Sequence, residues 1–292
     1  MADYSIWVLE YSYVSNYHVS GIVYGAHNQG YRKLPYCYVL IKGHGTAAMV
    51  DVGYNDKDYG GIMAKNFGVE NWHAPAAVLG ECGVTPEEVR HIFITHAHFD
   101  HMGNTDAFPN ATFYIQEKEL SKWVWAMSLD RRFRWLMLAT DPGDVMRVVD
   151  LARQGRLVCI DGDRQSVLPG IDLHAAFDTH TWGSMFVHVR NDGAAHSADS
   201  WVLAGDLVYS FDNIVGTAPS DPQYIPVGLA VGSQTNLMLT TDKMVQLAGG
   251  DTRRVIPIHE ERLRDAFPSR IAANGLRITE IALADGERSR VR

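Results

Sequence analysis

The chain has 292 residues, of which 46% are hydrophobic and 21% are charged, and its formal net charge is −8. This length and composition exclude a disordered chain, a collagen-like chain and a small scaffold without a substantial core. The acidic balance, without a dense basic run, argues against a nucleic-acid or anionic-membrane surface, so we expect a small-molecule partner.

Cysteine usage and the N-terminus bear on the compartment. Cys37, Cys82 and Cys159 are an odd number without a CxxC pair, so they predict buried thiols and neither a disulfide framework nor a thiolate zinc site. The first residues lack a positive segment followed by an apolar stretch, and nowhere do 18 apolar residues follow one another. We therefore expect a cytoplasmic protein.

The first half of the chain predicts strands that alternate with short helices. Segment 1–34 is rich in aromatic residues, which suit a ligand pocket, a subunit interface or a core strand equally. After it, residues 35–42 and 46–51 read as two strands of a hairpin that opens the fold. Helices are expected over 74–82 and after a capping box at 85–88, and strands over 90–95 and 111–116.

Residues 117–156 predict a helical insertion, with one helix over 118–138 and another from Asp141-Pro142 to about Arg153. The insertion contains four aromatic side chains, Trp123, Trp125, Phe133 and Trp135. Two interpretations are open: these side chains form a lid over a pocket, or they pack in the cores of the helices. The remaining chain predicts strands over 157–160, 172–177, 185–190, 201–205, 255–258 and 276–283, and a helix over 236–247. This alternation predicts two packed sheets with helices outside, in a single domain over 1–292.

A dense cluster of metal-ligand residue types follows the strand at 90–95. The sequence there reads Thr95-His96-Ala97-His98-Phe99-Asp100-His101, with three histidines and an aspartate within six residues. In an extended chain His96 and His98 point the same way and can chelate one ion, while the turn at Asp100 and His101 directs two more ligands to a second ion. Exposed surface histidines are the alternative, but imidazole and carboxylate at the end of a strand suit zinc and its neighbours.

This HxHxDH pattern resembles the metallo-β-lactamase superfamily, which implies a four-layer αββα sandwich of the α/β (α+β) class with a dinuclear metal site. The resemblance implies three downstream ligands, each after a predicted strand: His180, for which His174 is the close competitor, the bridging Asp206, and His259. It also implies that Asp51, in Val50-Asp51-Val52-Gly53, supports the site from behind the ligands. Two divalent ions are expected, Zn²⁺ by default, with Fe, Mn or Co accepted by the same ligands.

Within the superfamily, His98-Phe99-Asp100-His101 together with Asp206 and Tyr209 looks like the N-acyl-homoserine lactonase and 4-pyridoxolactonase group. The resemblance implies a metal-dependent hydrolase that opens a lactone by means of a metal-bridging hydroxide. Tyr209 is expected to donate to the developing oxyanion and Asp100 to assist protonation of the leaving alkoxide. The alternative for Tyr209 is a strand-end tyrosine that packs against the sheet.

The chain departs from these lactonases at Trp182, which stands where proline is common. Trp182 and the aromatic N-terminus favour a flat aromatic substrate over a flexible acyl chain. The alternatives are hydrolysis of an aryl ester, a thioester as in glyoxalase II, or an activated aryl ether, and a metal-binding subunit of a hetero-oligomeric hydrolase. From the resemblance alone we expect a homodimer or a hetero-oligomer.

Overall fold

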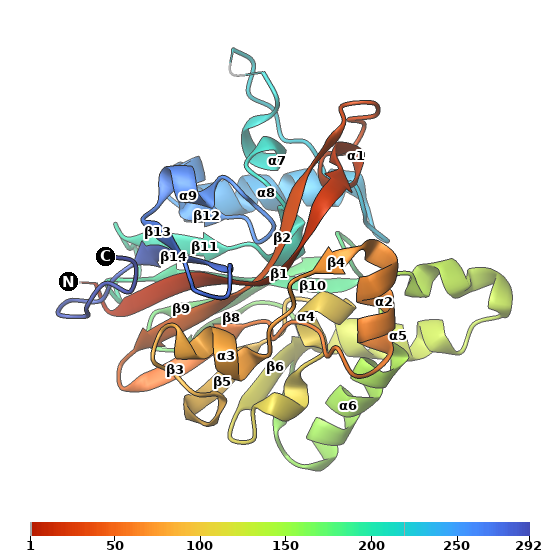
Figure 1. The fold of residues 1–292 in the computed structure, drawn as a ribbon, viewed down its shortest axis with the longest axis horizontal. Coiled ribbons are helices and arrows are strands. Elements are labelled where there is room, and N and C mark those ends of the chain that lie inside the picture. The colour runs from red at the N-terminus through yellow and green to blue at the C-terminus, as the bar shows by residue number, and fades with distance from the viewer. Residues whose placement is uncertain (1, 219) are drawn as a thin grey trace.

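Two β-sheets packed face to face form the centre of the molecule, and helices cover their outer faces (Figure 1). The computed structural model describes residues 2–218 and 220–292, and in this part of the chain the sheets have nine and five strands. The first sheet contains β1 (Tyr4–His18), β2 (Tyr31–Gly43), β3 (Thr46–Val50), β4 (Val69–Glu70), β5 (Val89–Phe93), β6 (Thr112–Gln116), β7 (Leu157–Ile160), β13 (Ser269–Ile271) and β14 (Arg277–Ala282). The second contains β8 (Arg164–Leu168), β9 (Ile171–Phe177), β10 (Gly183–Arg190), β11 (Ser200–Leu203) and β12 (Val255–Ile256).

The strand orders are β13-β14-β1-β2-β3-β5-β6-β7, with β4 paired to β1, and β12-β11-β10-β9-β8. Strands β3, β5, β6 and β7 run parallel, and the helices between them cross over the outer face of their sheet. The α-helices are α1 (Val19–Ile22), α2 (Tyr59–Phe67), α3 (Pro75–Gly80), α4 (Phe99–Met102), α5 (Glu117–Met127), α6 (Pro142–Arg153), α7 (Asp212–Val215), α8 (Gln234–Leu247) and α9 (Leu263–Ala266). Short 3₁₀ helices are η1 (Pro86–Glu88), η2 (Thr105–Ala107), η3 (Arg131–Met137), η4 (Gly205–Leu207) and η5 (Thr252–Arg254).

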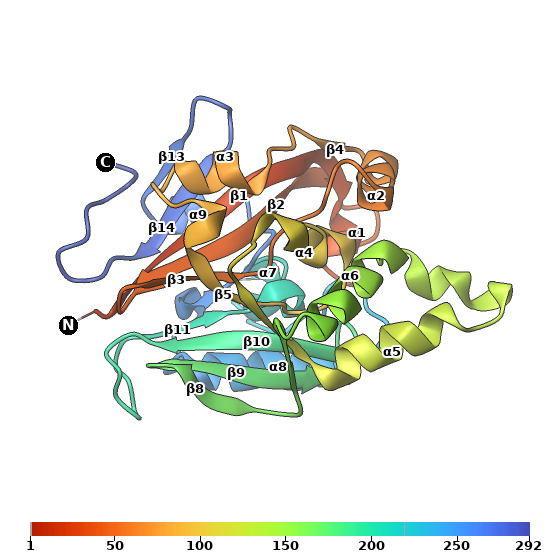
Figure 2. The ribbon, with the colours of Figure 1, turned by 90° about the horizontal axis from the view of Figure 1, so that it is seen from below.

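Side-chain alternation along the strands builds the layers. In β1, Ile6 and Val8 point into the core between the two sheets, whereas Trp7 and Leu9 point to the helices outside. Figure 2 shows α3 and α4 on one side of the paired sheets and α8 on the other. The expected four-layer αββα sandwich is therefore confirmed.

The aromatic N-terminal segment is mainly a core strand. The expected opening hairpin at 35–51 is wrong as a start of the fold, because β1 precedes it and lies between β14 and β2. Polar and apolar residues do not alternate along this strand because both of its faces are covered, and every residue from Tyr4 to Tyr11 is buried.

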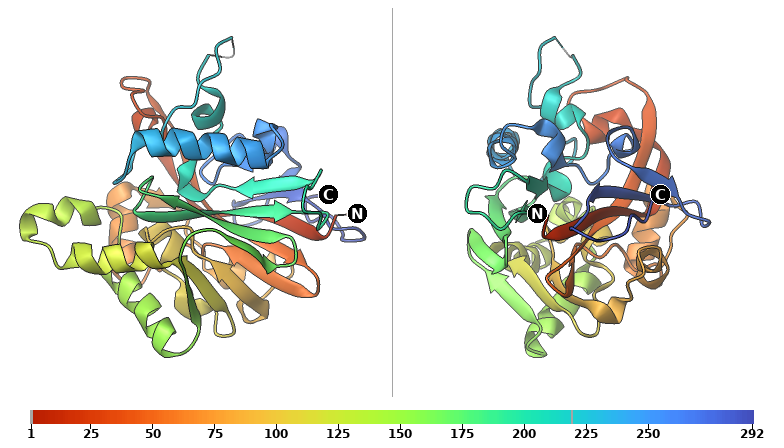
Figure 3. Two further views of the ribbon diagram at one scale, coloured as in Figure 1. Left: turned by 180° about the vertical axis from the view of Figure 1, so that it is seen from behind. Right: turned by 90° about the vertical axis from the view of Figure 1, so that its left-hand side faces the viewer.

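The helical segment after β6 also differs in detail from the expectation. The single helix predicted over 118–138 is divided into α5 and η3, and the chain turns between them at residues 128–130. Figure 3 shows these two elements as an arm that extends from the body of the molecule. The second helix, α6, begins at Pro142 behind the N-cap Asp141 and ends at Arg153, as predicted.

Two features bear on the expected environment of the protein. Cys37 and Cys82 are buried thiols as predicted, but Cys159 is exposed, because it lies on β7 at the edge of the first sheet. Within the described residues we find no helix with the length and apolar character needed to span a bilayer.

Candidate metal centre

All seven predicted ligands come together from four separate loops. His96, His98, Asp100 and His101 lie in the loop and first turn of α4 that follow β5, and His180 lies in the turn between β9 and β10. Asp206 lies in η4 directly after β11, and His259 follows β12. The ends of strands from both sheets thus supply donors to one place.

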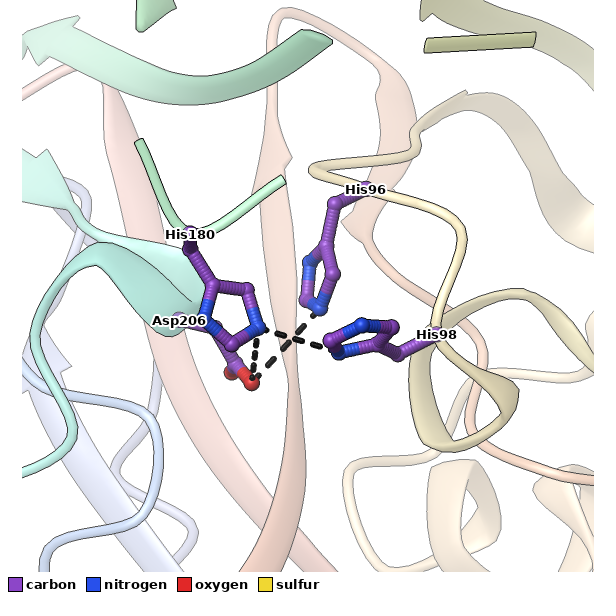
Figure 4. Close-up of side chains that lie close together, drawn as sticks. All are labelled: His96, His98, His180 and Asp206. Atoms are coloured by element: carbon purple, nitrogen blue, oxygen red, sulfur yellow. Dashed lines mark hydrogen bonds and ion pairs between the residues drawn. The ribbon is translucent and has the colours of Figure 1, made fainter. Parts of the chain in front are cut away.

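Three histidines and one carboxylate form the first group of donors. His96, His98, His180 and Asp206 each offer one ligand atom, and these atoms lie within 4.8 Å of one another. Nε2 of His180 lies 3.0 Å from Nδ1 of His98 and 3.3 Å from Oδ2 of Asp206, and Nε2 of His96 lies 3.5 Å from that same oxygen (Figure 4). Two imidazole nitrogens therefore lie against one carboxylate oxygen, and the third, Nδ1 of His98, lies against Nε2 of His180.

A second group lies on the other side of Asp206. Asp100, His101 and His259 also offer ligand atoms within 4.8 Å of one another. Oδ1 of Asp206 lies 3.0 Å from Nε2 of His101 and 3.1 Å from Nε2 of His259. The two oxygens of Asp206 face different groups, which is the arrangement expected of a bridging carboxylate.

The charges in the two groups differ. Burial lowers the pKa of His98 to about 3 and lowers the pKa of His96 well below its ordinary value, so these imidazoles are neutral at pH 7. For His101 burial also opposes protonation, but the carboxylates of Asp206, Asp100 and Asp51 outweigh it and raise its pKa well above the ordinary value. The imidazole of His101 in the second group is therefore protonated, whereas those of His96 and His98 in the first group are neutral.

The donor set fits two first-row divalent ions. All seven side chains are buried, and Nε2 of His96 has no hydrogen-bond partner within the described part of the chain. Buried polar atoms without partners are costly, and imidazole nitrogen with carboxylate oxygen is the donor chemistry of zinc, iron, manganese and cobalt.

The outward nitrogen of most of these imidazoles has a fixed partner. Nδ1 of His180 lies 2.7 Å from the carbonyl oxygen of Leu229, and Nδ1 of His259 lies 2.7 Å from that of Pro35. Because a carbonyl only accepts, Nδ1 carries a proton in both rings, and Nε2 is the nitrogen directed to the centre.

Asp51 lies behind the second group, as the resemblance implies. Its carboxylate accepts from the backbone N–H of Thr95 at 2.7 Å and from the Thr95 hydroxyl at 2.8 Å, and it lies 2.7 Å from Nδ1 of His101. Asp51 has a φ of 63°, a left-handed conformation that places its side chain under the ligand loop. It thereby fixes both the start of the loop and the ring of His101.

Glu119 plays the corresponding part for the first group and was not predicted. It accepts from the backbone N–H of Ala97 at 2.8 Å and of Gly183 at 2.7 Å, and from the Thr181 hydroxyl at 2.7 Å. The indole N–H of Trp123 donates to it at 2.7 Å, so four donors satisfy this fully buried carboxylate. One side chain of α5 thus joins the loop of His96 and His98 to the turn of His180.

Tyr209 lies beside the second group. Its ring centroid is 4.9 Å from that of His259 and 5.8 Å from that of His180, and burial raises the pKa of its phenol well above 10. It faces a cavity of about 30 Å³ that Tyr17 of the aromatic N-terminus and Tyr36 of β2 also line.

Two other sequence-based expectations change. Trp182 is not among the residues that line this cavity; it packs against Trp123 and Trp125, with ring centroids 4.7 and 5.9 Å apart. His174, the competitor for His180, lies on β9 in a separate cluster with Asp172 and His188.

Comparison with known proteins agrees with the geometry. The family model of the metallo-beta-lactamase superfamily matches residues 31–259. No curated protein matches the chain significantly by sequence. The chain belongs to the metallo-beta-lactamase superfamily.

Solved structures show the same fold at low sequence identity. A quorum-quenching N-acyl homoserine lactone lactonase is 16% identical, with a TM-score of 0.64 over 91% of this chain and 96% of its own. The dizinc quorum-quenching lactonase AidC, in complex with a product, is 15% identical, with a TM-score of 0.63 over 98% and 97%. The beta lactamase superfamily hydrolase AbOPH is 18% identical, with a TM-score of 0.64 over the same shares.

Proposed function

We propose that the protein is a dinuclear metal-dependent hydrolase that opens a lactone, a cyclic ester. The observation that carries the proposal is the position of Asp206, whose two carboxylate oxygens face two separate sets of histidine donors. The lactonase structures above support the choice of an ester substrate. Zinc is the proposed metal, because the five imidazoles and two carboxylates of the two groups suit it.

The first ion would be held by His96, His98 and His180, the second by Asp100, His101 and His259, and Asp206 would touch both. When bound, such ions polarise an ester carbonyl and make water a strong nucleophile near neutral pH.

Tyr209 is proposed to stabilise the charge that develops on the substrate, and Asp100 is proposed to assist the proton transfer to the leaving group. The Tyr209 phenol stays protonated because its pKa is raised, so it can donate a hydrogen bond to the oxyanion that develops on the substrate. The Asp100 carboxylate lines the same cavity as Tyr209, and in the proposal it assists protonation of the leaving alkoxide.

The surroundings of the cavity support a substrate with an apolar or aromatic part. Tyr17, Tyr36, Phe67 and Phe99 line the space next to Asp100 and Tyr209. A second cavity, of about 230 Å³, shares His98, Ala139 and Leu229 with the first and extends to Trp135 on η3. Because a cavity of about 30 Å³ is much smaller than a typical ligand site, we propose that η3 moves as a lid to admit substrate.

Proton release at constant pH tests the proposed reaction. Metal-loaded protein is assayed against acyl-homoserine lactones, aromatic lactones, aryl esters, a glutathione thioester and activated aryl ethers. We expect saturable turnover of a lactone, reduced about 10²-fold in Tyr209→Phe through the loss of an oxyanion donor. Tyr24→Phe, an exposed phenol away from the cavity, is the matched control.

Turnover confined to the thioester, aryl esters or ethers would retain the metallohydrolase and reject the lactone. Faster turnover of long-acyl than of aromatic lactones would count against an aromatic substrate. If no substrate of the panel released protons with both metals bound, the hydrolytic proposal would be rejected, and a metal-binding subunit that requires a partner chain would be favoured. Light scattering tests the homodimer or hetero-oligomer expected from the resemblance.

A further inference from the structure

A second cluster of histidines lies on the far face of the second sheet. Asp172 and His174 are on β9 and His188 is on β10, where it pairs with Asp172. Their neighbours Leu173 and Val187 point into the core between the sheets, so the three polar side chains point to the opposite face. Helix α8 lies on that side of the sheet, against β9 and β11 (Figure 3), and Asp172, His174 and His188 are all buried.

Each histidine of this cluster has one nitrogen engaged and one unpaired. Nδ1 of His174 lies 3.1 Å from Oδ2 of Asp163, and Nε2 of His188 lies 3.1 Å from the Ser200 hydroxyl. Nε2 of His174 and Nδ1 of His188 are buried and have no hydrogen-bond partner among the described residues. Two buried nitrogens left unpaired cost free energy, which a ligand between them would recover.

The cluster has the donors that a metal requires. One ligand atom each of Asp172, His174 and His188 lies within 4.8 Å of the others, and Nδ1 of His188 lies 3.7 Å from Oδ2 of Asp172. Burial, with His174 next to it, lowers the pKa of His188 to about 4, so its ring is neutral at pH 7. Neutral imidazole is the form that binds a metal ion.

The charged groups around the cluster hold its donors in place. The Arg190 guanidinium donates to the two oxygens of Asp172 at 2.8 and 3.1 Å, and the Lys243 ammonium of α8 lies 3.0 Å from Asp163. Two cations and two carboxylates balance, so these ion pairs account for the carboxylates but leave the two imidazole nitrogens without a partner. A carboxylate oxygen has a further lone pair with which Asp172 can bind an ion.

We propose that Asp172, His174 and His188 form a third metal site that takes Zn²⁺ or a first-row divalent ion of similar preference. This site would act structurally, because it joins the two strands whose connecting turn carries His180. It is separate from the centre around Asp206, and it does not depend on the proposed lactone chemistry.

Zinc stoichiometry tests the third site. Metal-free protein is given an excess of ZnCl₂, desalted and measured by elemental analysis. We expect His188→Gln to hold one zinc per chain fewer than the wild type. His91→Gln, which alters a partly exposed histidine of β5, should match the wild type. Equal zinc content in wild type and His188→Gln would overturn the proposal.

A second measurement covers the case in which His188→Gln fails to fold. Crystals of the zinc-loaded wild type, measured at the zinc absorption edge, should show an anomalous peak between His174 and His188. A map with peaks at the Asp206 centre and none at this position would overturn the third site. Both tests count metal rather than activity, so a failure of the lactone proposal leaves them readable.

Discussion

The two halves of the Asp206 centre use similar residues but differ in charge and in support. In the first half burial keeps His96 and His98 neutral, with lowered pKa values, and Glu119 of α5 joins their loop to the turn of His180. In the second half carboxylates raise the pKa of His101, and Asp51 of the first sheet orients its ring. Each half therefore has its own buried carboxylate behind the ligands, and Asp206 is the residue common to both.

Removing the common residue should have the largest effect. In Asp206→Asn we expect the metal content to fall and kcat/KM for a lactone to fall about 10³-fold, since several kcal/mol of charge stabilisation is lost. Elemental analysis and proton-release kinetics measure the two quantities. Asp221→Asn, which alters an exposed aspartate, is the control. Unchanged metal content in Asp206→Asn would contradict the bridging position.

Loss of Glu119 should weaken the first half. In Glu119→Gln the amide presents donors to N–H groups that need an acceptor, so we expect metal affinity and activity to fall about 10- to 100-fold. Thermal melting should also show a lower Tm, because Glu119 is fully buried. Glu117→Gln, an exposed carboxyl on the same helix, should behave as the wild type. Equal zinc affinity in the two variants would show that the Glu119 contacts do not support the ligands.

Loss of Asp51 should weaken the second half alone. Asp51→Asn retains the shape of the side chain but loses the charge beside Nδ1 of His101, and we expect about a 10-fold loss of affinity for one of two ions. A zinc titration should then separate into a tight and a weakened step. The exposed Asp56→Asn is the control, and a uniform weakening of both steps would argue that Asp51 does not act through one half.

The smallest expected effect is on the pH dependence of stability, which tests the difference in charge between the two halves of the centre. The folded pKa of His98 is about 3, against 6.5 for an ordinary histidine, so between these values the unfolded chain binds a proton that the native chain excludes. The free energy of unfolding of the metal-free protein should therefore fall as pH falls through this window, by at most about 1.4 kcal/mol per pH unit from this group.

The pKa of His101 is shifted in the opposite direction to that of His98, so its contribution to stability depends on pH in the opposite way. Its raised pKa gives a stabilising contribution that is complete below pH 6.5 and is lost only as pH rises through the folded value, so it adds no slope in the acid window. Denaturant unfolding from pH 4 to 6 should show a flatter profile for His98→Gln than for His101→Gln. Parallel profiles for the two variants would contradict the charge difference between the halves.

Features of the structure were predictable from the sequence where the residues that define them are close together in the chain. The loop from His96 to His101 is recognisable because its residues are contiguous, and His180, Asp206 and His259 each follow a strand within the same superfamily pattern. The structure brings all seven together. Helix α6 was equally predictable, because Asp141-Pro142 marks its start.

Features that depend on long-range contacts were missed. Glu119 is an ordinary glutamate in the first turn of a helix, and only the approach of Ala97 and Gly183 reveals its part. Trp182 suggested an aromatic substrate by its position in the sequence, yet it packs against α5, while Tyr17 of β1 lines the cavity. Tyr17 lies outside the residues that match the family model, and the aromatic density of segment 1–34 left a pocket, an interface and a core strand equally open for it.

A zinc titration of the metal-free protein, followed by lactone hydrolysis, tests most directly whether the two halves act as one centre. Chelator-treated protein receives Zn²⁺ in steps, and proton release from a lactone is measured together with bound zinc at each step. We expect turnover to stay low until both groups around Asp206 are filled, and we expect Asp206→Asn not to reach the turnover of the wild type at any zinc concentration. Full turnover with only one ion bound, or none with both groups filled, would contradict this expectation.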